Sequence, residues 1–188
     1  MTASVPPSEV KIRAATTSDV GAILSLIHEL AEYEREPPSV VATTEESLLN
    51  TLRFTPPHPT SQNLASCLLV FIPSSPEPVG FALYFTNFST WRGRGGIYLE
   101  DLFVKESARG KGIGKRLLGE LANEVIKMNG ERMDWSVLNW NEPSIQFYKK
   151  IGANIMSEWH TMRIEGTAAL SELAKSGKGF EGKSTTLM

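Results

Sequence analysis

The sequence of 188 residues has a single cysteine and no excess of charge of either sign. Cys67 cannot form a disulfide within the chain, and its apolar surroundings predict a buried structural thiol rather than a nucleophile. Nineteen lysines and arginines against twenty-one acidic residues give a formal net charge of -2. Because proteins that bind nucleic acids typically carry a cationic surplus, we expect no nucleic-acid partner.

Long apolar runs are also missing. No stretch approaches the ~20 apolar residues that a membrane-spanning helix needs. Residues 1–9 lack the basic segment and apolar run of a secretory signal. These absences predict a soluble, cytoplasmic protein that does not bind a membrane.

The length supports one domain with a sizeable core, since a chain of this size buries roughly 70% of its unfolded surface. We expect a flexible N-terminus over residues 1–9 and a single folded domain over residues 10–174. Residues 175–188 are polar and rich in glycine, lysine and serine, which predicts a flexible C-terminal tail.

Hydrophobic periodicity predicts alternating helices and strands. A helix is expected from Val20 to Tyr33, and Thr43 with Glu46 has the spacing of a capping box that opens a shorter helix. Two further helix patterns cover 113–128 and 141–148. The expected strands lie at 10–13, 65–72, 79–88, 97–104, 133–138 and 159–164.

A glycine-rich loop stands between the strand pattern at 97–104 and the long helix pattern that follows. The free N–H groups at a helix N-terminus attract phosphate oxygens, and glycine lets a ligand approach the backbone. The spacing matches neither the P-loop nor the dinucleotide fingerprint, and a tight turn without a ligand remains an alternative. The loop consists of Arg109, Gly110, Lys111, Gly112, Ile113, Gly114 and Lys115.

The order of the motifs resembles a known superfamily. The glycine loop follows an apolar strand that contains the acidic pair Glu100 and Asp101, and this combination resembles the acetyl-CoA loop of the GCN5-related N-acetyltransferases. The segments 29–34 and 140–150 narrow the resemblance to the spermidine/spermine (diamine) N-acetyltransferases and their thialysine-acetylating relatives. The resemblance covers residues 10 to about 165.

This resemblance implies an α/β fold with a mixed, mostly antiparallel twisted sheet, helices on both faces, and strands splayed at the acetyl-CoA site. Because side chains alternate along a strand, Glu100 and Asp101 should face opposite sides unless a bulge intervenes. The resemblance implies such a bulge. It also implies a homodimer.

The resemblance further implies roles for individual residues. Tyr148 would be the general acid that protonates the departing thiolate, and Glu100 the general base, acting through water. A packed, hydrogen-bonded tyrosine remains the alternative for Tyr148. Amine-binding residues would be Tyr33, Glu34, Glu100, Asp101 and Trp159. Acetyl-CoA would contact Leu102, Phe103, Val104, the loop from Arg109 to Lys115, Asn141 and Ser144.

The predicted activity is direct transfer of an acetyl group from acetyl-CoA to a primary amine of a small cationic substrate, in a ternary complex and without a metal. Charges between Leu99 and Leu102 of a central strand would be costly without a function. Spermidine or spermine is the first expected acceptor. Thialysine or another small amine is the second, because the family's acidic C-terminal segment is shortened here to 157–159. An acetyl-CoA-binding module without turnover is the remaining alternative.

Overall fold

The computed structural model describes residues 9–178. By their internal contacts they form two compact units, one ending at Ile145 and one beginning at Gln146. Of the predicted flexible ends, 1–9 and 175–188, residues 1–8 and 179–188 lie outside the described residues. None of the described helices is both long and apolar enough to cross a membrane. The single domain over 10–174 stays a prediction.

A six-stranded sheet forms the frame of the first unit. Its strands follow the order β1-β3-β4-β5-β6, and β2 pairs with β3 off this path. Neighbours from β1 to β5 are antiparallel, whereas β2 with β3 and β5 with β6 are parallel. The strands are β1 (Lys11–Ala14), β2 (Leu52–Arg53), β3 (Ala65–Phe71), β4 (Gly80–Ser89), β5 (Arg94–Val104) and β6 (Met133–Trp135).

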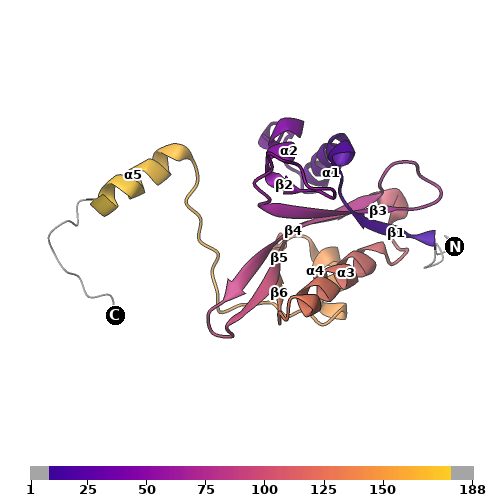
Figure 1. Cartoon of the computed structure of the whole chain (residues 1–188). Helices are drawn as coiled ribbons and strands as arrows, with labels where there is room; N and C mark the ends of the chain where they lie inside the picture. The colour runs from indigo at the N-terminus through magenta and orange to yellow at the C-terminus, as the bar shows by residue number, and fades with distance from the viewer. Residues whose placement is uncertain (1–8, 179–188) are drawn as a thin grey trace. The chain divides into compact units, whose positions relative to one another are not determined.

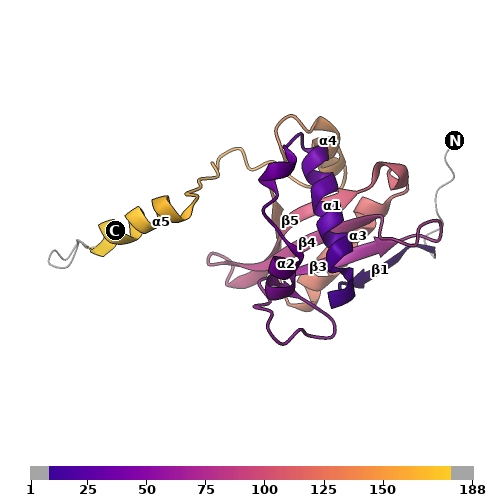
Figure 2. The ribbon, with the colours of Figure 1, turned by 90° about the horizontal axis from the view of Figure 1, so that it is seen from above.

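Helices cover both faces of this sheet (Figure 1). Helices α1 (Val20–Tyr33) and α2 (Glu45–Thr51) lie on one face, and α3 (Ile113–Lys127) lies on the other. Figure 2 shows α1 lying across the middle strands. Its buried side chains pack with residues of β3, β4 and β5 in one core, among them Ile23, Leu26, Leu69, Phe81 and Phe103. The mixed, mostly antiparallel α/β fold is therefore confirmed.

Local chemistry explains where the second helix begins. The predicted capping box of Thr43 and Glu46 is wrong by one position, because Thr44 caps α2. Ser47 donates its backbone N–H to the Thr44 hydroxyl at 3.1 Å and accepts the Thr44 N–H at 2.9 Å. A serine hydroxyl thus takes the place of the usual glutamate carboxylate.

The second unit contains the end of α4 (Glu142–Lys150) and α5 (Thr167–Lys178). Helix α5 runs past Ala174 into the predicted tail, and Lys175 pairs with Glu172 one turn earlier at 2.7 Å. The predicted strand at 159–164 is wrong: these residues are exposed and lie in neither helix nor strand. Alternation alone cannot make a strand, because a strand also needs a neighbour to pair its backbone.

Candidate functional site

Strand β5 has a bulge at its acidic pair. The consecutive residues Leu83 and Tyr84 of β4 stand opposite Asp101 and Leu99, so Glu100 is the extra residue. Without a bulge, Leu99 and Asp101 would face the same side of the sheet. With it, Asp101 shares a face with its partner Leu83, which packs against the core beneath α1. The predicted bulge is confirmed.

The neighbouring strand ends where the bulge begins. Pairing between β5 and β6 runs from Ile97 with Met133 to Leu99 with Trp135. Strand β5 continues to Val104, beyond the last residue of β6. The predicted splaying of the two strands therefore starts at Glu100. This arrangement leaves residues 100–104 without a β6 partner, as a ligand lying between the strands would require.

Three carboxylates gather at this point of the fold. Burial, followed by the negative charges of Glu100 and Glu34, raises the pKa of Asp101 to about 7. The pKa of Glu34, just after the last residue of α1, is also raised, by burial and by Glu36. Such a cluster attracts a cation and can accept its proton, because a cationic ligand relieves the repulsion between the carboxylates.

The glycine loop has the geometry of a phosphate-binding turn. Gly110 and Gly112 both have φ of +76°, and Gly112 precedes the first residue of α3. A Cβ built at either glycine would meet no atom within 4 Å, so the space beside the loop is open. The first N–H groups of α3 have no partner within the helix and can donate to an anion. The loop is thus open to an anion, and its binding of the pyrophosphate of acetyl-CoA stays a prediction.

Lys111 and Lys115 of the same loop differ in exposure. The Lys111 ammonium donates to the Ser107 carbonyl oxygen at 3.2 Å, whereas Lys115 is exposed. Both can add positive charge near the start of α3.

Arg109 is directed away from the centre of the loop. Its Nε donates to the Val104 carbonyl oxygen at 2.9 Å, and its guanidinium carbon lies 4.5 Å from the centroid of the Tyr33 ring. The same carbon is 5.7 Å from the centroid of Phe103. Arg109 thus connects predicted cofactor-binding residues with a predicted amine-binding residue.

Asn141 completes this cluster from the start of α4. Its buried side-chain oxygen accepts the Tyr33 hydroxyl at 3.1 Å and the Ser144 backbone N–H at 3.4 Å. Trp140, which the sequence analysis did not single out, lies 6.3 Å from Tyr33 between ring centroids and carries the guanidinium of Arg35 over its ring at 4.1 Å. The sequence signal that could have pointed to Trp140 is its place directly before the capping residue Asn141.

The remaining site predictions belong to the second unit. Helix α4 carries Tyr148, whose ring centroid lies 5.3 Å from that of Phe147 and whose carbonyl oxygen accepts the N–H groups of Ile151 and Ala153. Trp159 is 63% exposed, and its N–H donates to the Met156 carbonyl oxygen. Their roles as acid and amine contact stay predictions.

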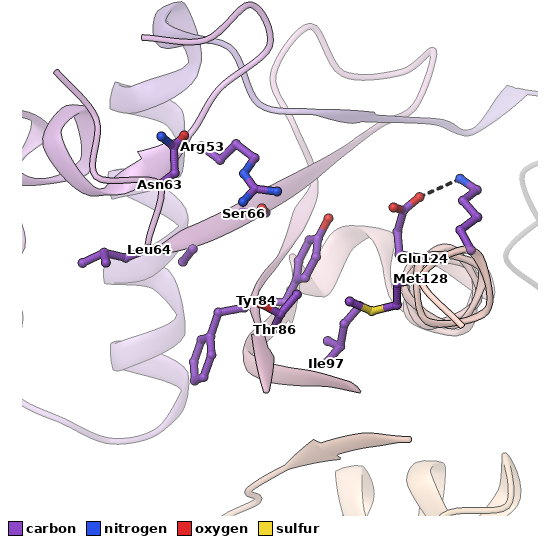
Figure 3. Close-up of a pocket in the computed structure, with 12 residues that line it drawn as sticks. Arg53, Asn63, Leu64, Ser66, Tyr84, Thr86, Ile97, Glu124 and Met128 are labelled. Carbon is purple, nitrogen blue, oxygen red and sulfur yellow. Dashed lines mark hydrogen bonds and ion pairs between the residues drawn. The ribbon is translucent and has the colours of Figure 1, made fainter. Parts of the chain in front are cut away.

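A separate cavity of about 320 Å³ opens between the sheet and α3 (Figure 3). Its lining includes Arg53, Ser66, Tyr84 and Glu124, and Glu124 pairs with Lys127 at 2.6 Å. None of the predicted site residues in the described part of the chain lines this cavity. It lies on the face opposite to Asp101, so it is distinct from the carboxylate cluster.

The lone cysteine is buried in β3. Cys67 pairs with Leu83, the residue that faces Asp101 on the next strand. Burial and the charge of Asp101 raise the pKa of the thiol, which keeps it protonated and unreactive. The expected structural role of Cys67 agrees with this environment.

Comparisons with known proteins agree with the geometry. The pattern of the Acetyltransferase (GNAT) family matches residues 27–153. The chain is 38% identical to a thialysine N-epsilon-acetyltransferase of Bos taurus, over 88% of the chain and 97% of that protein. It is 33% identical to the spermidine/spermine N(1)-acetyltransferase-like protein 1 of Homo sapiens, over 82% of the chain but 22% of that protein. An integron cassette protein from the mobile metagenome of V.cholerae has a TM-score of 0.69 at 32% identity, over 89% of this chain and 98% of that one.

The bulged strand, the glycine turn at a helix start and the match to the family together identify an acyltransferase that uses acetyl-CoA. The chain belongs to the Acetyltransferase (GNAT) family. It is an acetyl-CoA-dependent N-acetyltransferase that acts on a small amine.

We expect that replacing Gly114 with leucine weakens acetyl-CoA binding by at least about tenfold, because the new side chain would occupy space at the phosphate-binding turn. Gly114 lies in the first turn of α3, so the backbone tolerates a side chain there. Gly112 is a poorer probe, since its φ of +76° strains any substitution. Titration calorimetry with acetyl-CoA gives the affinity.

Gly119→Leu in the same helix is the matched control, because Gly119 is exposed and a Cβ there meets nothing within 4 Å. This variant should bind acetyl-CoA like the unmodified protein. Equal affinities of the Gly114→Leu and Gly119→Leu proteins would place the pyrophosphate away from this loop.

Proposed function

We propose that the acceptor is the terminal amine of thialysine or of a similar lysine-like amino acid, with spermidine as the second candidate. The observation that carries the proposal is the cluster of Glu34, Glu100 and Asp101, which supplies attraction for one ammonium group. A long polyamine has further ammonium groups that need carboxylates of their own. The only acidic residues in the exposed segment 154–166 are Glu158 and Glu165. The carboxylate of Glu165 lies 3.7 Å from the guanidinium of Arg163, which already offsets its charge.

The relatives support this order of acceptors. The thialysine acetyltransferase of Bos taurus is matched over nearly its whole length, whereas the spermidine/spermine-like protein is matched over a small part of its length. The order of the two predicted acceptors is therefore reversed in the proposal, and the class of small cationic amine is kept.

The proposed chemistry is direct transfer within a ternary complex. The bound ammonium loses a proton to Glu100 through a water molecule, and the neutral nitrogen attacks the thioester carbonyl carbon. A C–N bond forms, the C–S bond breaks, and Tyr148 gives its phenolic proton to the coenzyme A thiolate. Asp101 holds the ammonium group before it is deprotonated. No covalent intermediate with the enzyme is needed.

The substrate can be tested by comparing kcat/KM for thialysine, spermidine and a short diamine, with thiol release from acetyl-CoA as the readout. We expect thialysine to exceed spermidine by at least about tenfold, which is about 1.4 kcal/mol of transition-state discrimination. A tenfold preference for spermidine would overturn the order of acceptors. Absence of thiol release with every amine would contradict the proposed substrate class.

A further inference from the structure

Tyr33 is the last residue of α1 and the centre of a cluster drawn from four parts of the first unit. Its ring centroid lies 6.4 Å from that of Phe103 in β5 and 6.3 Å from that of Trp140. The guanidinium of Arg109 lies over its ring at 4.5 Å. Its hydroxyl donates to the side-chain oxygen of Asn141 at 3.1 Å. The ring and the hydroxyl are therefore both engaged by protein groups.

Asn141 is buried, with 5% of its surface exposed. Its side-chain oxygen accepts two hydrogen bonds, from the Tyr33 hydroxyl and from the Ser144 N–H in the first turn of α4. An asparagine in this arrangement satisfies a helix N–H that would otherwise lack a partner. The hydroxyl of Tyr33 fixes the orientation of this amide, and through it the start of α4.

We propose that Tyr33 is a positioning residue, which holds the start of helix α4 through Asn141 rather than binding the amine. This inference rests on the proposed function, because α4 is the helix that carries the general acid Tyr148. A general acid must be placed within hydrogen-bond reach of the departing thiolate, and small displacements lower the rate steeply. Loss of the hydroxyl would shift α4 and affect turnover.

The same contacts link the two ligands. Glu34 follows Tyr33 directly and belongs to the carboxylate cluster, whereas Arg109 belongs to the glycine loop. The end of α1 therefore contributes a carboxylate to the amine site and, through Tyr33, a support for the acetyl-CoA side. The hydrogen bond between Tyr33 and Asn141 joins residues that are 108 positions apart in the chain.

The first test separates positioning from amine binding by the kinetics of the Tyr33→Phe protein. This variant keeps the ring and removes the hydroxyl. We expect kcat to fall about tenfold, because the acid is displaced, while the KM of the amine changes by less than roughly twofold. Tyr98→Phe is the matched control: its hydroxyl interacts with Ser136 Oγ at 3.0 Å, away from this cluster, and kcat should be unchanged. A raised amine KM with unchanged kcat would show that Tyr33 binds the substrate.

A double-mutant cycle tests the route through Asn141. The Asn141→Ala change removes the acceptor of the Tyr33 hydroxyl, so the further loss of that hydroxyl should have no effect. The Tyr33→Phe/Asn141→Ala protein should therefore have the kcat of the Asn141→Ala protein. Additive losses of kcat would overturn the proposal, because they would mean that the two residues act independently.

Amide hydrogen exchange gives a readout that does not depend on turnover. In the Tyr33→Phe protein, exchange in residues 144–150 should be on the order of fivefold faster, and exchange in α3 should be unchanged. Unchanged exchange in residues 144–150 would overturn the positioning role even if the enzyme is active. If the unmodified protein acetylated no amine, the proposed function would fail, while this measurement would still decide the role of Tyr33.

Discussion

Replacing Tyr148 with phenylalanine should lower the turnover number about a hundredfold, which is the usual contribution of a general acid. A thiolate that leaves without a proton is a poorer leaving group than a thiol, so the barrier to breaking the C–S bond rises. Phenylalanine keeps the ring that lies 5.3 Å from Phe147 and removes the hydroxyl alone. Acetyl-CoA affinity should stay within roughly twofold, since the acid acts only as the thiolate forms.

The measurement is kcat from thiol release, supported by a single-turnover experiment that isolates the chemical step. Tyr98→Phe again serves as the control for removing a tyrosine hydroxyl from this protein. If the chemical step of the Tyr148→Phe enzyme were as fast as that of the unmodified enzyme, Tyr148 would have a packing role. The proton would then reach the thiolate from another donor.

Features set by local pattern were predicted well from the sequence. Helix α1 follows from an apolar stripe with a period of one helical turn, and its last residue, Tyr33, was predicted as such. The bulge at Glu100 was implied by the family resemblance, since regular alternation along the strand would have placed Glu100 and Asp101 on opposite faces. The glycine turn before α3 follows from residue types that tolerate positive φ.

Features that depend on contacts between distant parts of the chain were not predicted from the sequence. The predicted strand at 159–164 has suitable alternation, but its residues are exposed and lie outside every strand of the described chain. The pairing that ends β6 at Trp135, before the predicted residue 138, is likewise a property of two strands together. The contacts of Arg109 with Tyr33, and of Tyr33 with Asn141, connect parts of the chain that share no local pattern. Sequence periodicity assigns residues to faces, and only the fold decides which faces meet.

Between pH 5 and pH 8 the unmodified protein should lose about 2 kcal/mol of unfolding free energy that the Asp101→Asn protein keeps. The variant should therefore be the more stable of the two proteins at pH 8. Burial and the charges of Glu100 and Glu34 together raise the pKa of Asp101 from 3.8 to about 7, so the folded state binds more protons than the unfolded state between these values. The free energy of unfolding therefore falls as the pH rises through this window, at up to about 1.4 kcal/mol per pH unit. Asparagine cannot ionise and removes this decline. Urea unfolding at pH 5 and pH 8 measures it.

Asp19→Asn is the control, because the pKa of Asp19 is lowered in the folded protein whereas that of Asp101 is raised. The guanidinium of Arg13, at 2.7 and 2.8 Å from the two carboxylate oxygens, lowers the pKa of Asp19 below its ordinary value. Its stabilisation is fully present above the unfolded pKa and is lost only as the pH falls through the folded pKa. Asp19→Asn should therefore destabilise the protein equally at pH 5 and pH 8. A similar pH-independent result for Asp101→Asn would contradict the raised pKa.

The same Asp101→Asn change should raise the KM of the amine while it stabilises the fold. A cationic acceptor favours ionised Asp101, and asparagine offers no charge, so the KM of the amine should rise on the order of tenfold. Acetyl-CoA affinity should not change, because the glycine loop is untouched. The unmodified enzyme thus keeps a carboxylate that destabilises its empty state, as expected where binding of a cation offsets the repulsion. An unchanged amine KM would remove Asp101 from the amine site and leave its burial without a functional reason.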